Sequence, residues 1–422
     1  MHNENLKSGL VACHECDLLH EICEVPHHGR AHCTRCGAEL YRHIPNGLDK
    51  MLALQLAALL LFLIANLFPF LSLEFGGRGE QMLLASASFK FFSAGMEGLG
   101  VLVFLTSVLF PLMTIGGMVY ILLPIRLGYR PPWMSQVYRV VRVVAPWSLL
   151  GVFMLGVLVS FVKLLDMATV IPGVALYAFA ALLLVTTMAR YIHDESVIWP
   201  LVGHDVGERV LSGSASEHGL LHCHICGLLS EGPAEDEHHE HCQRCGSQLH
   251  SRKRESVART WALIATATIL FIPANVYPVM TITQLGSSDS STILGGVVKL
   301  IESGMWPLAL LVFFASIVVP GLKLIVLTLL LVTVQRGSLW RLRDRTTLYR
   351  LTEAVGSWSM VDVFLVAVLA ALVDLDALST ISPEVGVNFF AAVVVVTIVA
   401  AQSFDPRLIW DSDERSGRKE LE

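Results

Sequence analysis

Eight long apolar stretches limit what this chain can fold into. A helix needs about 20 mostly apolar residues to cross the hydrocarbon core of a membrane. Two stretches contain a single charge each, Lys323 in Ser303–Val334 and Asp362 in Ala354–Val373. Six contain none: Met51–Leu73, Gly98–Ile125, Val143–Val162, Met167–Ala189, Thr260–Ser288 and Val385–Phe404. Since only 16% of the 422 residues are charged and 54% are hydrophobic, we expect an all-α polytopic membrane protein with eight spans.

The distribution of Lys and Arg predicts the orientation of these spans. Loops that carry an excess of Lys and Arg stay in the cytoplasm. Alternate segments hold 25 of the 30 Lys and Arg residues: 1–50, 126–142, 190–259, 336–350 and 405–422. Both termini are therefore expected to be cytoplasmic. The basic run Arg252–Arg254 lies just before a span and fits the same rule, so no nucleic-acid partner is expected.

The two halves of the chain repeat each other. The sequence A-N-L-F-P at Ala65–Pro69 returns as A-N-V-Y-P at Ala274–Pro278, and Tyr138-Arg139 returns as Tyr349-Arg350. Such a register over 200 residues indicates a tandem duplication. We predict four domains, which are ribbon 1 (1–49), module 1 with four spans (50–205), ribbon 2 (206–257) and module 2 with four spans and a tail (258–422).

Each copy begins with two C-x-x-C pairs. The cysteines of ribbon 1 and ribbon 2 are Cys13, Cys16, Cys33 and Cys36, then Cys223, Cys226, Cys242 and Cys245. Two such turns close a tetrahedron of thiolates, which is the pattern of a zinc ribbon. Two zinc ions per chain are expected, with rubredoxin-type iron as the alternative. Cys23 is unpaired, and the nearby histidines are expected to be loop residues.

Lys323 and Asp362 are the most informative residues inside the predicted spans. Ionisable groups inside a membrane are costly and mark functional sites. Both lie about 18–20 Å from the cytoplasmic flank of their helices, so we expect a buried ion pair. Ser316 lies on the face of Lys323, and Thr397 of the last span is a further candidate. The first copy has the neutral residues Thr114 and Gly151 at the matching positions, so the charges favour a transport role in module 2, with a structural pair that locks two helices as the alternative.

A shared asparagine and proline motif ends the first span of each module. Asn66 and Pro69 are repeated as Asn275 and Pro278. A proline frees a helical carbonyl that the asparagine side chain can satisfy, which would leave a kinked end. We interpret these residues as architectural.

These motifs resemble those of the paraquat-inducible protein A family (PqiA/LetA). The resemblance rests on the duplicated cysteine pairs, on A-N-x-[FY]-P and on the terminal F-D-P-R-L-I-W at Phe404–Trp410, and it covers essentially the whole chain. The first copy departs from the last motif with H-D-E-S-V-I-W at His193–Trp199. The resemblance implies a Gram-negative inner-membrane protein that works with a periplasmic MCE-domain protein to move phospholipid between membranes and to maintain envelope integrity.

Two other functional classes stay open from the sequence. An ion-coupled small-molecule exporter would also use Lys323 and Asp362, and a membrane metal or redox sensor would use the ribbons and Cys23. The sequence has no G-x-x-x-x-G-K, G-x-S-x-G or H-E-x-x-H motif, so an enzyme is not expected.

The orientation is testable by chemical labelling. A cysteine introduced at Ser288 should react with a membrane-impermeant reagent in spheroplasts, because the loop after the fifth span is expected to be periplasmic. A cysteine at Ser338, in a loop expected to be cytoplasmic, should stay unlabelled until the membrane is opened. The opposite pattern would contradict the predicted topology.

Overall fold

The computed structural model describes residues 10–23, 25–26, 29–75, 78–165, 169–193, 198–199, 213–231, 241–284, 287–372 and 379–411. It contains eight helices long and apolar enough to cross a membrane, as expected from the sequence. They are Gly47–Leu67, Glu97–Arg126, Met134–Val162, Val174–Ile192, Ser256–Val276, Trp306–Gln335, Leu342–Ala371 and Val385–Ser403. The predicted domain boundary between positions 205 and 206 lies outside the described residues.

The two modules have the same order of elements. Module 1 consists of α1 (Gly47–Leu67), β5 (Leu71–Phe75), β6 (Arg78–Met82), α2 (Ser86–Ser93), α3 (Glu97–Phe104), η1 (Leu105–Leu109), α4 (Phe110–Arg126), α5 (Met134–Val144), η2 (Ala145–Trp147), α6 (Leu150–Leu165), β7 (Thr169–Pro172) and α7 (Val174–Ile192). Module 2 consists of α9 (Ser256–Val276), β10 (Met280–Gln284), β11 (Ser287–Ser291), α10 (Ile293–Glu302), α11 (Trp306–Phe313), η5 (Phe314–Val318), α12 (Val319–Gln335), α13 (Leu342–Val355), η6 (Gly356–Met360), α14 (Val361–Leu372), β12 (Ser379–Pro383), α15 (Val385–Ser403) and η7 (Pro406–Ile409).

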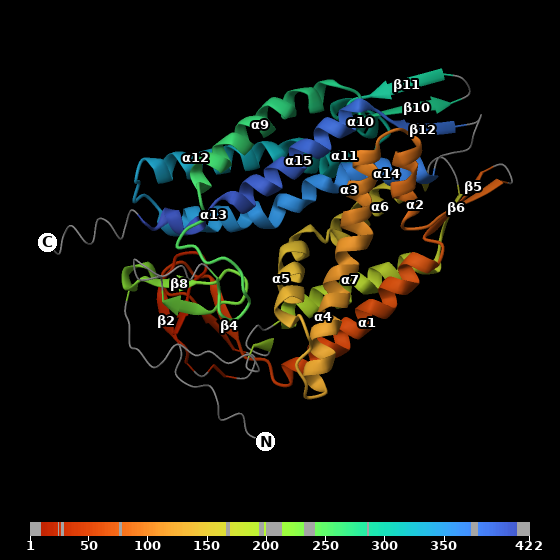
Figure 1. Ribbon diagram of the computed structural model, residues 1–422. Coiled ribbons are helices and arrows are strands. Elements are labelled where there is room, and N and C mark those ends of the chain that lie inside the picture. The colour runs from red at the N-terminus through yellow and green to blue at the C-terminus, as the bar shows by residue number, and fades with distance from the viewer. Residues whose placement is uncertain are drawn as a thin grey trace.

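Each module carries a three-stranded antiparallel sheet that the all-α expectation did not include. The strand orders are β6-β5-β7 and β11-β10-β12, with Leu73 paired to Val170 and Ile282 paired to Ile381. No charged residue separates the helix from the strand in the sequence, because the apolar run continues from α1 into β5. Both sheets lie at the same end of the molecule, and the ribbons lie at the opposite end (Figure 1).

The asparagine of each A-N-x-[FY]-P motif bonds to a different carbonyl from the one expected. The side-chain amides of Asn66 and Asn275 donate to the carbonyl oxygens of Phe62 and Phe271, four residues earlier, at 2.8 Å. A proline frees the carbonyl four residues before itself, which here is neither Phe62 nor Phe271. The Pro69 carbonyl instead accepts from the amide of Ala175 at the start of α7, which joins the first and last spans.

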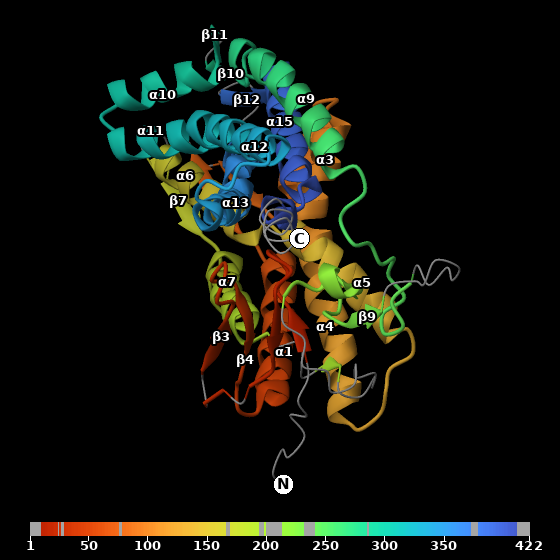
Figure 2. The ribbon, with the colours of Figure 1, turned by 90° about the vertical axis from the view of Figure 1, so that its left-hand side faces the viewer.

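The two modules pack on each other through α14. Almost every described side chain of α14 is buried, and the helix lies against α6 of module 1. At the contact, a Cβ on Gly156 would lie 2.9 Å from the Cβ of Phe364, so only glycine allows this approach. The ring of Phe364 packs edge-on against Phe153, with centroids 5.3 Å apart. Turning the molecule by 90° shows the green and blue helices of module 2 above α1, α4 and α7 of module 1 (Figure 2).

Candidate functional site

The two ribbons are built from short hairpins that end in the C-x-x-C turns. Ribbon 1 has β1 (Leu10–Ala12) paired with β2 (Leu19–Glu21), and β3 (Arg30–His32) paired with β4 (Glu39–Arg42). Ribbon 2 has η4 (Ser216–His218) and the pair of β8 (Leu220–His222) with β9 (Leu229–Glu231). The residue after the second cysteine of each turn has a left-handed backbone. It is Gly37, Gly227 or Gly246 in three turns and Asp17 in the fourth.

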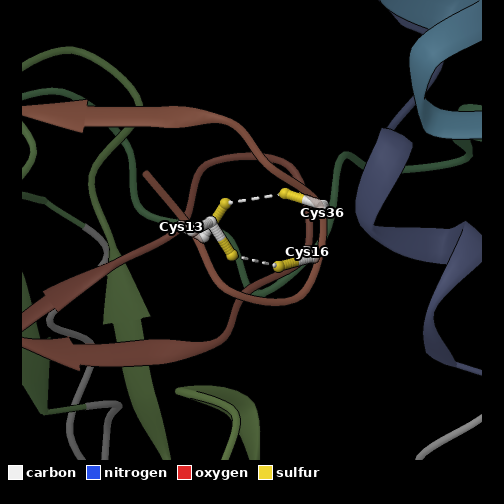
Figure 3. A group of neighbouring side chains, drawn as sticks. Cys13, Cys16 and Cys36 are labelled. Carbon is white, nitrogen blue, oxygen red and sulfur yellow. Dashed lines mark hydrogen bonds between the residues drawn. The ribbon is translucent and has the colours of Figure 1, made fainter. Parts of the chain in front are cut away.

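The eight paired cysteines form two compact groups of buried thiols, and each group can hold a metal ion. In ribbon 1, the sulfur of Cys13 lies 3.4 Å from that of Cys36, and Cys16 lies 3.4 Å from Cys33. In Figure 3, the sulfurs of Cys13, Cys16 and Cys36 turn toward a common centre. Four sulfurs on a tetrahedral metal lie about 3.8 Å apart. All four ligand atoms of each group lie within 4.8 Å of one another, so the geometry fits such an ion.

Polar side chains next to the cysteines complete the two sites. The Nε2 atom of His20 lies 3.3 Å from the sulfur of Cys33, although the histidines were expected to be loop residues. In ribbon 2, the hydroxyl of Ser247 lies 3.1 Å from the sulfur of Cys223. Hydrogen bonding among the thiols of each group lowers the pKa of Cys33 and of Cys223 and raises the pKa of Cys16 and of Cys226.

Each ribbon packs on the module of the other copy. Cys13, Cys16, Cys33 and Cys36 of ribbon 1 share a buried cluster with α12, α13, α15 and η7 of module 2. The cysteines of ribbon 2 share a cluster with α1, α4 and α5 of module 1. The ribbons also contact each other, since the amide of Leu19 donates to the carbonyl of Gly213 and that of Ala215 to the carbonyl of Asp17. Figure 1 shows their strands β2, β4 and β8 grouped below α13.

Equivalent arginines make both crossed contacts. Arg350 of α13 donates to the carbonyl of Cys36 at 3.0 Å, and Arg139 of α5 donates to the carbonyl of Cys245 at 2.6 Å. Arg350 also forms an ion pair with Glu15. Burial would raise the pKa of Glu15, but hydrogen bonds from His14 and Arg350 outweigh it and lower that pKa.

In both ribbons, an arginine stacked on a tryptophan ring supports the crossed packing of ribbon on module. In ribbon 1, Arg35 lies over the ring of Trp410, with 4.5 Å to the centroid. In ribbon 2, Arg244 lies over the ring of Trp199 at 5.8 Å. Because the repeat relates each pair to the other, the crossed packing is a symmetric property of the duplication.

The terminal motif of the second copy makes a further set of contacts. Arg407 of the terminal motif donates to the carboxylate of Asp405 at 3.0 Å, forms an ion pair with Asp17 of ribbon 1 and contacts Nε2 of His224 of ribbon 2 at 3.1 Å. Burial would raise the pKa of Asp405, but Arg407 outweighs it and lowers that pKa to about 2. The first copy has Ser196 at this position, which lies outside the described residues.

The second candidate site lies inside module 2. Lys323 of α12 is 2% exposed, and its ammonium donates to the carbonyl of Gly356 at 2.8 Å and to the hydroxyl of Thr397 at 3.4 Å. Asp362, at the start of α14, is 5% exposed. The Ser316 hydroxyl donates to the carbonyl of Val312 and lies near the Asp362 carboxylate without a hydrogen bond to it. These four residues come from four segments that the sequence separates by up to 81 positions.

The expected ion pair between Lys323 and Asp362 is not formed. Within the part of the chain that the structure describes, no salt bridge joins them, and neither carboxylate oxygen of Asp362 has a hydrogen-bond partner. The helix pair α13–α14 is interrupted by the 3-10 turn η6, which turns the carbonyl of Gly356 toward α12. Lys323 bonds there instead. Equal depth in the membrane was therefore not sufficient to predict the contact.

Ser316 lies in a π-helical turn that the sequence analysis did not predict. The segments η1 and η5 are π-helical and occupy equivalent positions in the two modules. Such insertions are frequent at functional sites, because they redirect side chains within a helix. Neither segment has a proline or glycine that would have signalled it.

Several known proteins have sequences similar to this chain. A family model described as paraquat-inducible protein A matches residues 48–202 and again 257–414. The chain is 33% identical over 418 residues to an Escherichia coli K12 protein named intermembrane transport protein PqiA, covering 97% of each chain. It is 28% identical over 409 residues to the E. coli lipophilic envelope-spanning tunnel protein A, covering 95% of this chain and 91% of the relative. A Haemophilus influenzae protein named probable intermembrane transport protein is 25% identical over 424 residues, covering 96% of this chain and 97% of the relative. No solved structure gives a significant match.

The crossed packing can be tested with two matched substitutions. Arg350→Ala should loosen ribbon 1, and Arg139→Ala should loosen ribbon 2. Each removes charge-assisted hydrogen bonds, so we expect trypsin to cleave the freed ribbon roughly tenfold faster. Mass spectrometry of the first cleavage products identifies the ribbon. Faster cleavage of ribbon 2 in Arg350→Ala would contradict the arrangement.

Proposed function

Because this chain belongs to the paraquat-inducible protein A family, we propose that it is the inner-membrane component of a system that carries lipid between the inner and outer membranes, together with a periplasmic MCE-domain partner. The names of its relatives, which refer to intermembrane transport and to a lipophilic tunnel, support this function. The ribbons and both termini are cytoplasmic in this proposal, in agreement with the charge of the loops.

The need for a partner follows from the shape of the periplasmic end. Beyond the spans, each module offers a three-stranded sheet and one short helix, α2 or α10, at that end. These elements are too small to reach across a periplasm. The sheets of the two modules would together offer a binding surface for a separate periplasmic protein.

The observation that carries the proposal is the unpaired carboxylate of Asp362. A buried carboxylate inside a membrane is costly unless it exchanges its proton or pairs with a cation. Lys323 of α12 contacts Thr397 of α15, so module 2 holds a second buried polar group within its apolar bundle. A polar site of this kind can bind part of a lipid head group or relay protons. No nucleotide-binding motif is present in the sequence, so the proton gradient or the lipid gradient supplies the energy.

The polar site is testable by removing both charges. The double change Lys323→Met and Asp362→Leu preserves volume and leaves no unpaired charge, so module 2 should fold. We expect normal protein levels in membranes and loss of function, measured as detergent sensitivity of cells that rely on this system. Thr114→Met is the matched control, because Thr114 is the first-copy counterpart of Lys323, and it should retain function. Full function in the double variant would mean that the two charges serve packing alone.

The metal of both ribbons is zinc in this proposal. Four buried thiolates in tetrahedral arrangement suit zinc, and reduced cysteines are the rule in the cytoplasm. Bound zinc organises the fold of so small a domain.

Elemental analysis should therefore find close to two zinc ions per purified chain. The change Cys13→Ser with Cys16→Ser should remove one of them and lower the amount of protein in the membrane, because ribbon 1 would lose its fold. The change Cys23→Ser is the control and should keep the full zinc content, since Cys23 is an exposed free thiol outside both groups. Iron in place of zinc, or no metal, would refute the assignment.

A further inference from the structure

A groove runs along module 2 between α9 and α12. It is shallow and largely open along its length, with a volume of about 640 Å³. Thr268 of α9 forms one wall, and the face of α12 from Gly321 to Thr333 forms the other. The two helices lie side by side in Figure 1. The groove is separate from the polar site, because Lys323 lies on the buried face of α12.

The lining of the groove is effectively apolar. Leu324, Leu329 and Val332 contribute side chains without polar atoms. Three threonines also face it, but their hydroxyls donate to carbonyls of their own helices. These bonds join Thr268 to Ile264, Thr328 to Leu324 and Thr333 to Leu329, at 2.7–2.8 Å. The threonines therefore offer mainly their methyl groups, and the groove suits a ligand made of hydrocarbon.

The length and position of the groove correspond to one leaflet of a bilayer. The twelve residue steps from Gly321 to Thr333 span about 18 Å. One leaflet contributes about 15 Å of hydrocarbon, half of the core thickness. Since α12 ends at Gln335, on the side of the basic loop 336–350, the lined segment lies in the cytoplasmic leaflet.

Groups at the cytoplasmic end fit a lipid head group. Arg336 is exposed three residues after Thr333, on the same face of the helix. The indole N–H of Trp261 donates to the side chain of Gln335 at 3.3 Å, which joins α9 to the cytoplasmic end of α12. Trp340 is exposed nearby in sequence, and Arg341 lies over its ring at 5.5 Å. Exposed tryptophan and arginine are typical of the membrane interface, where arginine attracts phosphate.

Module 1 is different at the same place. Leu59 stands where module 2 has Thr268, and Leu112 stands where it has Gly321. The helices α1 and α4 also pack on each other more closely than α9 and α12 do. The groove is therefore a property of the second copy, which also contains Lys323 and Asp362.

We propose that this groove binds one acyl chain of a phospholipid from the cytoplasmic leaflet, with its phosphate near Arg336. The site would hold a lipid on the lipid-facing side of module 2, against α12, whose opposite face carries Lys323. This inference deepens the proposed lipid transport and rests on it for its role. The binding itself can be measured without transport.

Photolabelling of the full chain tests the site directly. The purified protein is placed in vesicles of phosphatidylethanolamine and phosphatidylglycerol that contain phosphatidylglycerol with a photoactivatable acyl chain. Mass spectrometry then maps the labelled residues. We expect label to concentrate on the α12 face from Gly321 to Thr333, and the equivalent face of α4 to carry much less. Equal labelling of the two faces would mean ordinary lipid contact and would overturn the proposal.

Substitutions taken from the first copy provide the matched variant. Thr268→Leu with Gly321→Leu should lower the labelling of α12 by about tenfold, because the added side chains displace several methylene groups of the ligand. A Cβ on Gly321 meets no atom within 4 Å, so the change has room in the groove. Gly116→Leu, the same kind of change on lipid-facing α4, should leave α12 labelling unchanged.

A second variant keeps the test decisive if the protein with Thr268→Leu and Gly321→Leu fails to fold. Arg336→Gln leaves the groove open and removes the charge proposed to bind phosphate. It should lower the labelling of α12 by phosphatidylglycerol with a photoactivatable acyl chain. Unchanged labelling would exclude Arg336 from the site. Unchanged labelling in the folded Leu variant would refute the groove as the binding site, whatever the outcome of the transport assays.

Discussion

The crossed contact between each metal ribbon and the opposite membrane module is the interaction on which the rest of the structure depends. Arg350 bonds to the carbonyl of Cys36, and Arg139 bonds to that of Cys245. Hydrogen bonds to a charged group that is partly shielded from water are among the stronger ones. Since each arginine reaches the last cysteine of a C-x-x-C pair, metal binding, ribbon folding and helix packing are joined in one unit. Neither copy is complete without the other.

The duplication also lets the two copies diverge. Module 2 contains the buried Lys323 and Asp362, the groove beside α12 and the contacts made by Arg407. Module 1 has neutral or larger residues at the corresponding positions, such as Thr114 and Leu112. The first copy has the same fold without these charges, so the fold does not require Lys323 and Asp362. We infer that module 1 has a structural role and that module 2 carries out the proposed transport.

The sequence predicts what depends on local composition and fails where distant segments meet. Uncharged stretches such as Gly98–Ile125 revealed the spans, because lipid requires continuous apolar helices. The spacing of Cys13 to Cys36 revealed the metal groups. Equal depth in the membrane suggested an ion pair of Lys323 with Asp362, but Lys323 donates to the carbonyl of Gly356 in the turn before α14 instead. The crossed ribbons left no local signal, although Arg139 and Arg350 at repeated positions were visible in the duplication.

Transfer of lipid between vesicles tests the central claim most directly. Donor vesicles would contain this chain, its MCE-domain partner and a fluorescent phospholipid, and the signal would be its arrival in acceptor vesicles. The account predicts transfer that requires both proteins and is lost when Asp362→Asn removes the exchangeable carboxylate. Transfer by the partner alone, or full transfer by the Asp362→Asn protein, would contradict it.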